Sequence, residues 1–222
     1  MIKKKASMKG FELTVNEKKI KGAIKEGSTC VILTHRDNEY NIYFGSLDNA
    51  GMLSYIWYSS KPEDDAKFTI SVEDIGETSE PAVIMDYSNK EQLNKLSLEY
   101  YYKLRDELAK EEGNQIRGFI VRYKNEEIKI AAKDGLAMID VFENKGERRL
   151  SIGLFDYADS TRSIYDPISL DMGDKFEVEL AEIEESSQPV KVIKDNTIKC
   201  VTKSKLEVFM ELENDLKKRG LL

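Results

Sequence analysis

The chain is poor in the residues that most often carry out chemistry or hold metal ions. Among 222 residues there are one histidine and two cysteines, too few nitrogen and sulfur ligands for a zinc site of the usual kind. A Ser-His-Asp or Cys-His arrangement would have to use the single histidine, His35, and no nucleophile-elbow motif accompanies it. His35 lies in a polar stretch, and we expect it to be an exposed loop residue. Walker-A and GxGxxG phosphate loops are also missing, so we expect no metal and no cofactor.

Long apolar runs are missing as well. No stretch approaches the 18 or so apolar residues that a membrane-spanning helix needs, and the charged N-terminus has no apolar segment behind it as a secretory signal would. Cys30 and Cys200 fall at non-equivalent positions, so we interpret both as buried free thiols rather than as a disulfide. These features predict a cytoplasmic protein with no membrane partner.

The chain also lacks an excess of positive charge. The chain has 34 basic and 41 acidic residues, a formal net charge of −7. Binding to nucleic acid needs a concentrated Lys/Arg surface that neutralises phosphates. A nucleic-acid partner is therefore not expected.

What the chain does contain is an internal repeat. Residues 10–110 align with residues 118–218 at a constant shift of 108, with 24 identities over 101 positions and no gap. Self-similarity of this kind predicts a tandem duplication. We expect two units, 9–112 and 116–220, each of about 105 residues and large enough to bury a core of its own.

Each unit begins with strands and ends with a helix. Alternating apolar and polar residues predict six or seven strands, the first two forming a hairpin. Apolar residues then recur at helical spacing and predict amphipathic helices over about 92–111 and 203–219. The stripes consist of Leu98, Tyr101, Leu104 and Leu108 in the first unit and of Leu206, Phe209, Leu212 and Leu216 in the second. The predicted class is α+β with mostly antiparallel β: two sandwich or partly open barrel units, each closed by a C-terminal helix against one face or end.

Some polar residues are present in both copies. Asp48 and Asp156 could be catalytic acids, but an aspartate just after a strand favours capping of the following turn. Lys21 and Lys25, with their counterparts in the second copy, could form a binding ridge. Lysines on an edge strand more often prevent pairing with another sheet.

Residues that recognise a partner are expected at positions where the two copies differ. Ile56 matches Ile164 and is expected to point inward, so Tyr55 and Trp57 should point outward; the alternative is that both rings are buried under the helix or between the units. An outward aromatic pair beside the acidic residues Glu63, Asp64 and Asp65 is typical of protein interfaces, which combine aromatic anchors with a charged rim. We therefore predict that these five residues bind a partner.

The prediction that follows is a non-enzymatic, cytoplasmic protein-binding module, for example an immunity or inhibitor protein that caps a toxin or an enzyme. One alternative is an enzyme or small-molecule sensor with a carboxylate and lysine site in the cleft between the units. Another is a structural or assembly subunit that forms homo-oligomers.

Overall fold

The computed structural model describes residues 8–36, 39–63, 66–108, 117–132, 135–157, 160–194 and 205–222. The first segment of the chain forms β1 (Met8–Val15), β2 (Lys18–Ala23), β3 (Ser28–Arg36), β4 (Glu39–Asp48), β5 (Leu53–Ser60), β6 (Lys67–Ile75), β7 (Val83–Asp86) and α1 (Lys90–Leu108). The second segment forms β8 (Arg117–Tyr123), β9 (Glu126–Ala131), β10 (Gly135–Asn144), β11 (Glu147–Asp156), β12 (Thr161–Ile164), β13 (Ile168–Ser169), β14 (Lys175–Glu182), β15 (Lys191–Lys194) and α2 (Lys205–Lys218).

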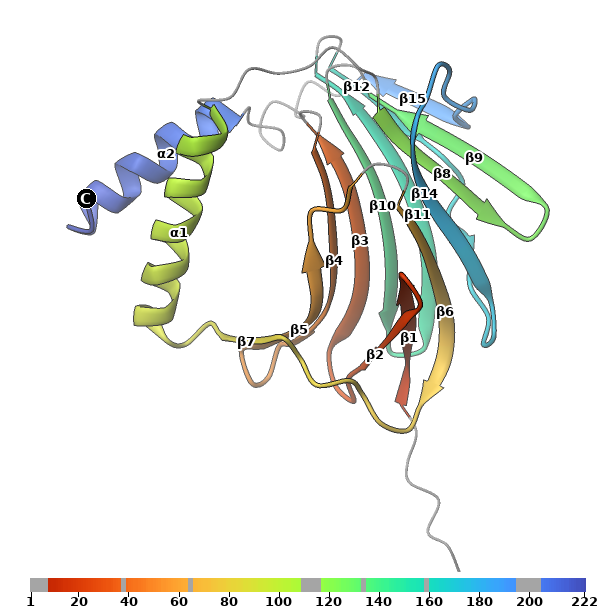
Figure 1. Ribbon diagram of the computed structural model, residues 1–222, viewed down its shortest axis with the longest axis horizontal. Helices are drawn as coiled ribbons and strands as arrows, with labels where there is room; N and C mark the ends of the chain where they lie inside the picture. Colours follow the sequence, from red (N-terminus) through yellow and green to blue (C-terminus); the bar gives the residue numbers. More distant parts are fainter. Residues whose placement is uncertain are drawn as a thin grey trace, which may run out of the picture.

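The strands form two antiparallel sheets that face each other (Figure 1). The six-stranded sheet has the order β2-β1-β6-β14-β8-β9. The nine-stranded sheet has the order β15-β12-β11-β10-β3-β4-β5-β7, with β13 paired to β11. The predicted α+β class with mostly antiparallel strands is confirmed. Both sheets are open and face each other, as in a sandwich.

Strands from the two segments meet in the middle of each sheet. β6 pairs with β14, and β3 pairs with β10 along nine residue positions. Tyr40 adds a contact across the same boundary, because its hydroxyl donates to the carbonyl oxygens of Gly118 at 2.9 Å and Ala181 at 3.2 Å. In each sheet the two segments contribute equivalent strands in the same order from the edge inward: β2-β1-β6 corresponds to β9-β8-β14, and β7-β5-β4-β3 corresponds to β15-β12-β11-β10. A duplication predicts this arrangement. The duplication itself and the unit boundaries 9–112 and 116–220 stay predictions.

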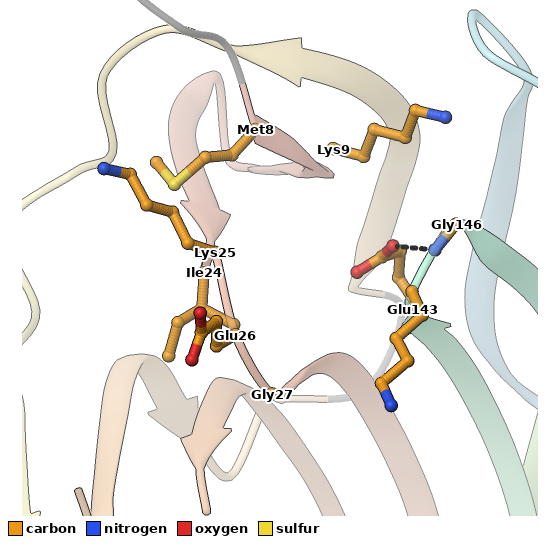
Figure 2. Close-up of a pocket in the computed structure, with 9 residues that line it drawn as sticks. Met8, Lys9, Ile24, Lys25, Glu26, Gly27, Glu143 and Gly146 are labelled. Carbon is orange, nitrogen blue, oxygen red and sulfur yellow. Dashed lines mark hydrogen bonds between the residues drawn. The ribbon is translucent and has the colours of Figure 1, made fainter. Parts of the chain in front are cut away.

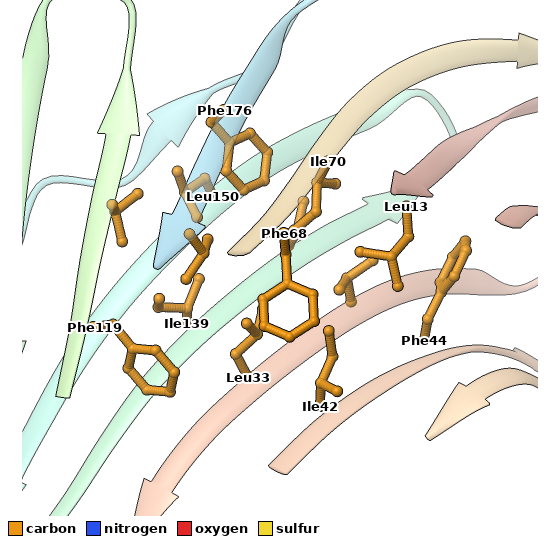
Figure 3. Close-up of a cluster of buried hydrophobic side chains, with 14 of the residues drawn as sticks. Leu13, Leu33, Ile42, Phe44, Phe68, Ile70, Phe119, Ile139, Leu150 and Phe176 are labelled. Carbon is orange, nitrogen blue, oxygen red and sulfur yellow. The ribbon is translucent and has the colours of Figure 1, made fainter. Parts of the chain in front are cut away.

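The segments do not bury separate cores. Inward-facing side chains of both sheets and both segments form a single cluster (Figure 3). Its fully buried phenylalanines are Phe11, Phe44, Phe68, Phe119 and Phe176. The alternation of buried and less buried residues that produces this cluster is clear in β3 and β10, where every second residue faces the other sheet. Because fully burying a side chain of this kind contributes roughly 1.5–3 kcal/mol, the shared cluster holds both segments in one structure.

Several sheet edges are covered by other parts of the chain. After β6 the backbone passes along β2, where Ser79 N–H donates to the Lys21 carbonyl at 2.8 Å. Ser187 makes the same 2.8 Å contact with Lys129 of β9. At β7 the side chain of Gln92 takes the place of a strand, accepting Asp86 N–H at 2.9 Å and donating to the Ile84 carbonyl at 3.2 Å. Covered edges of this kind resist pairing with a further strand.

The helices pack mainly against each other, beside the sheets (Figure 1). The Tyr101 ring stacks on Phe209 with centroids 5.0 Å apart, while Leu104 and Leu216 are buried. The apolar stripes of the two helices therefore cover part of one another. α1 also contacts the end of its own segment's sheet, since Lys61 after β5 pairs with Glu107 of α1 and with Glu39 of β4. Neither described helix is long and apolar enough to cross a membrane.

Candidate functional site

An apolar hollow of about 590 Å³ opens between the start of β1, the end of β2 and strands β5 and β7. Tyr55, Trp57, Pro81 and Ile84 supply much of its apolar wall. Charged residues stand at its border: Lys25, Glu26 and Asp48. Its volume and its mixture of apolar wall and few charged groups lie in the usual range for binding pockets.

Trp57 forms part of the floor and belongs to the core. Its side chain is 7% exposed, its indole packs against Phe44 at 5.3 Å, and its Nε1–H donates to the Ser79 carbonyl at 3.0 Å. The expectation that Trp57 points outward is therefore wrong. Phe44 lies opposite Tyr58 whereas Gly45 lies opposite Ile56, so Trp57 is an extra residue in β5. Such a β-bulge redirects side chains, and simple alternation fails at it.

Tyr55 remains half-exposed beside a group of exposed apolar side chains. It lies opposite Ile84 in the pairing of β5 with β7. We define the apolar patch as Tyr55, its cross-strand partner Ile84 (49% exposed) and Met52 (51% exposed) in the β4–β5 turn. Leu47 and Val83 are also exposed, but they lie opposite Ser54 and Ile56 and therefore on the other face of the sheet. Exposed apolar residues that gather beside a hollow commonly mark an interaction site.

Glu63, the one predicted acidic residue that the structure describes, does not join this patch. Glu63 is exposed but lines a different hollow, of about 730 Å³, beside the β1–β2 turn. β5 runs from Leu53 to Ser60 in extended form, so Tyr55 and Glu63 lie toward opposite ends of that strand. Asp64 and Asp65 lie outside the described residues.

A second hollow, of about 630 Å³, adjoins the apolar one and is rich in charge. The two share Met8, Ile24, Lys25 and Glu26. Lys9 of β1, Glu143 of β10 and the β10–β11 turn residues Lys145 and Gly146 complete most of its lining. Residues of both segments therefore build this charged hollow, which Figure 2 draws.

The carboxylate of Glu143 is fixed inside the charged hollow. The side chain is 5% exposed and accepts Gly146 N–H at 3.0 Å (Figure 2). Lys9 and Lys25 lie on opposite sides of the hollow in the same view. Within the described residues, Lys9, Lys25 and Lys145 make no ion pair. Sequence reasoning did not single out Glu143, although a charged residue in the inward register of Ala137, Ile139 and Val141 was a usable signal.

The turn between the two hollows depends on a glycine. Gly27 has a φ of 128°, and a Cβ there would lie 2.1 Å from the Leu47 carbonyl oxygen. Only glycine combines this backbone conformation with so close an approach. Gly135, its counterpart in the second segment, is held equally close to the Phe155 carbonyl oxygen.

Asp48 caps the turn after β4, as expected. Its Oδ1 accepts Ala50 N–H at 3.0 Å and Gly51 N–H at 2.9 Å, and the same residue borders the apolar hollow. Lys21 is also engaged within the protein, because its Nζ lies 3.5 Å from Glu12 Oε2. Both observations favour structural roles for these repeated polar residues.

His35 is buried, and the expectation of an exposed loop is wrong. β3 extends to Arg36, which places His35 in the inward register of Val31 and Leu33 with 2% exposure. Its ring lies 4.5 Å from that of Tyr40. Because β3 begins next to Gly27, His35 lies at the far end of that strand from both hollows.

Other groups that could take part in a reaction or bind a metal lie away from the hollows. Cys30 is a free, half-buried thiol, and burial raises its pKa to about 12, with a smaller contribution from Asp140. At neutral pH such a thiol is protonated and a poor nucleophile. Cys200 lies outside the described residues. In the part of the chain that the structure describes, no group of three or more His, Cys, Asp or Glu side chains could hold a metal ion.

Comparison with protein families, with curated proteins and with solved structures finds no match for this chain.

Replacing Trp57 tests whether the floor of the apolar hollow is part of the core. We expect Trp57→Ala to lower the free energy of unfolding by about 3–5 kcal/mol, since it removes a buried ring and a hydrogen bond. Trp57→Phe, which keeps a ring, should cost less than Trp57→Ala. Tyr100→Ala, at a residue 47% exposed on α1, should cost below about 1 kcal/mol. Urea unfolding followed by circular dichroism measures all three; equal losses for Trp57→Ala and Tyr100→Ala would contradict the core role.

Proposed function

We propose that this protein is a non-enzymatic, cytoplasmic protein-binding module, and that its partner binds at the apolar patch and the hollow beside it. The observation that carries the proposal is that half-exposed Tyr55 and exposed Ile84 line a concave apolar surface, with exposed Met52 in the β4–β5 turn nearby. Scattered exposed apolar residues are normal on soluble proteins, whereas a group beside a hollow needs a reason.

The composition of this surface suits a protein partner. Interfaces between proteins combine an apolar centre, often with aromatic anchors, and a charged rim that stays in contact with water. Tyr55 and the ring of Trp57 lie at the centre, and Lys25, Glu26 and Asp48 supply the rim. A small ligand would need the hollow alone and would leave the neighbouring patch exposed.

An immunity or inhibitor protein that caps a toxin or an enzyme is the kind of module we propose. A capping protein needs a rigid surface and no chemistry of its own. Preorganised surfaces bind with a smaller entropic cost, and a patch built on paired strands and a capped turn satisfies that requirement.

Capture of the partner tests the proposed surface. The variant Met52→Ser with Ile84→Ser removes two patch residues that are 51% and 49% exposed. The control Met210→Ser with Val192→Ser changes two residues of 52% and 57% exposure elsewhere. In quantitative pull-downs from the native host, the patch variant should retain about tenfold less partner than the unmodified protein, and the control should retain as much. Equal retention by both variants, or the absence of any captured protein, would count against the proposal.

A second candidate function is small-molecule sensing or catalysis in the charged hollow. It is favoured by one observation: lysines and carboxylates from both segments line this hollow, namely Lys9, Lys25, Glu26, Glu143 and Lys145. That composition is the one predicted for a site between the units.

Thermal unfolding tests the second candidate with defined probes. A ligand present at 100 times its Kd stabilises the folded state by about 2.7 kcal/mol, which for a chain of this length raises Tm by roughly 5–11 °C. We expect citrate, phosphate, glutamate or adenosine monophosphate to give such a shift if the candidate is correct, and Lys25→Ala to reduce it. No shift with any of these four probes would argue against a small anionic ligand.

A further inference from the structure

We propose that the partner presents an extended peptide segment in which an apolar residue is followed closely by carboxylates. The apolar side chain occupies the apolar hollow, and the carboxylates face Lys9, Lys25 and Lys145 in the charged hollow. This inference rests on the proposed function and specifies the chemistry of the partner.

The first step is the closeness of the two hollows. They share Met8, Ile24, Lys25 and Glu26, so only the short segment after β2 separates them. An extended chain advances about 3.3 Å per residue, and its side chains at positions two to four residues apart therefore span such a divider. One peptide segment can occupy both hollows at once.

The lysines that line the charged hollow are accessible to a partner. Several lysines elsewhere on the protein are already paired: Lys19 with Glu12 at 2.7 Å, Lys61 with Glu39 at 2.6 Å and Lys67 with Glu179 at 3.3 Å. Lys9, Lys25 and Lys145 are exposed and, among the described residues, make no ion pair. Three unpaired ammonium groups around one hollow contrast with the net charge of −7 of the whole chain.

The acidic residues of the charged hollow contribute little accessible negative charge. The Glu143 carboxylate is buried and accepts the Gly146 N–H, so it is engaged with its own turn. Glu26 is the exposed carboxylate of the lining. The accessible charge of the hollow is therefore mainly positive, which complements an acidic segment.

The fourth step is the spacing of the charges. Figure 2 shows Lys9 and Lys25 extending on opposite sides of the hollow. Carboxylates distributed along a peptide can reach both sides of the hollow at once. This spacing favours a peptide over a single small anion as the occupant.

Selection from a displayed library of random ten-residue peptides tests the inference on the full chain. We expect the enriched peptides to carry an aromatic or branched aliphatic residue with at least two Asp or Glu within the next four positions. A synthetic copy of the most enriched peptide should bind about tenfold more weakly to the variant Lys9→Glu, Lys25→Glu, Lys145→Glu. The control Lys18→Glu, Lys90→Glu, Lys191→Glu changes three other exposed lysines and should bind as the unmodified protein does.

Two further measurements keep the outcome independent of how the triple variant folds. Raising the salt concentration from about 50 to about 300 mM should weaken binding of the peptide to the unmodified protein several-fold, because exposed charge pairs are screened. The patch variant Met52→Ser, Ile84→Ser should also lose the peptide.

The possible results separate the two proposals. Enriched peptides without acidic residues, lost by the patch variant and retained by the triple lysine variant, would overturn this inference and leave the proposed function standing. Acidic peptides that the patch variant still binds would overturn it in favour of a ligand in the charged hollow alone. A library that yields no enrichment would overturn this inference and leave the proposed function to the pull-down with the patch variant.

Discussion

The pairing of β3 with β10 and of β6 with β14 is the constraint on which the rest of the structure depends. Each of these pairs joins a strand of the first segment to a strand of the second, in the interior of a sheet. If either segment were removed, the other would expose the edges of two central strands and one side of the common core. The charged hollow exists for the same reason, since Lys9 and Glu143 are contributed by different segments.

The way in which the sheet edges are covered determines which apolar surface is left accessible. The segments that carry Ser79 and Ser187 cover β2 and β9, and Gln92 covers β7 with its side-chain amide. Apolar area is left accessible at one end of the sandwich, around the β4–β5 turn and β7. Edges that resist pairing together with an exposed apolar patch favour binding through side chains rather than by addition of a strand.

Much of the local structure could be predicted from the sequence, because local periodicity determines it. The helices predicted over 92–111 and 203–219 are found at Lys90–Leu108 and Lys205–Lys218 within the described residues, and the predicted opening hairpins are found as β1–β2 and β8–β9. Pairing between the segments could not be predicted, since one unit contains no information about which of its edges meets the other. Trp57 was misplaced because a bulge depends on the register with β4. His35 was misplaced because polar neighbours concealed the length of β3. At the candidate site, Tyr55 was identified from the sequence, but the charged hollow was not, because its residues meet only in the folded chain.

The central claim is that both segments share one fold, and native-state hydrogen exchange at increasing denaturant tests it most directly. Amides of β1, β3 and β4 should converge with those of β8, β10 and β11 on the same free energy of opening, because none of these strands can lose its pairing without disrupting the common core. Two separate free energies, one for each segment, would contradict the claim and would indicate two units that unfold independently.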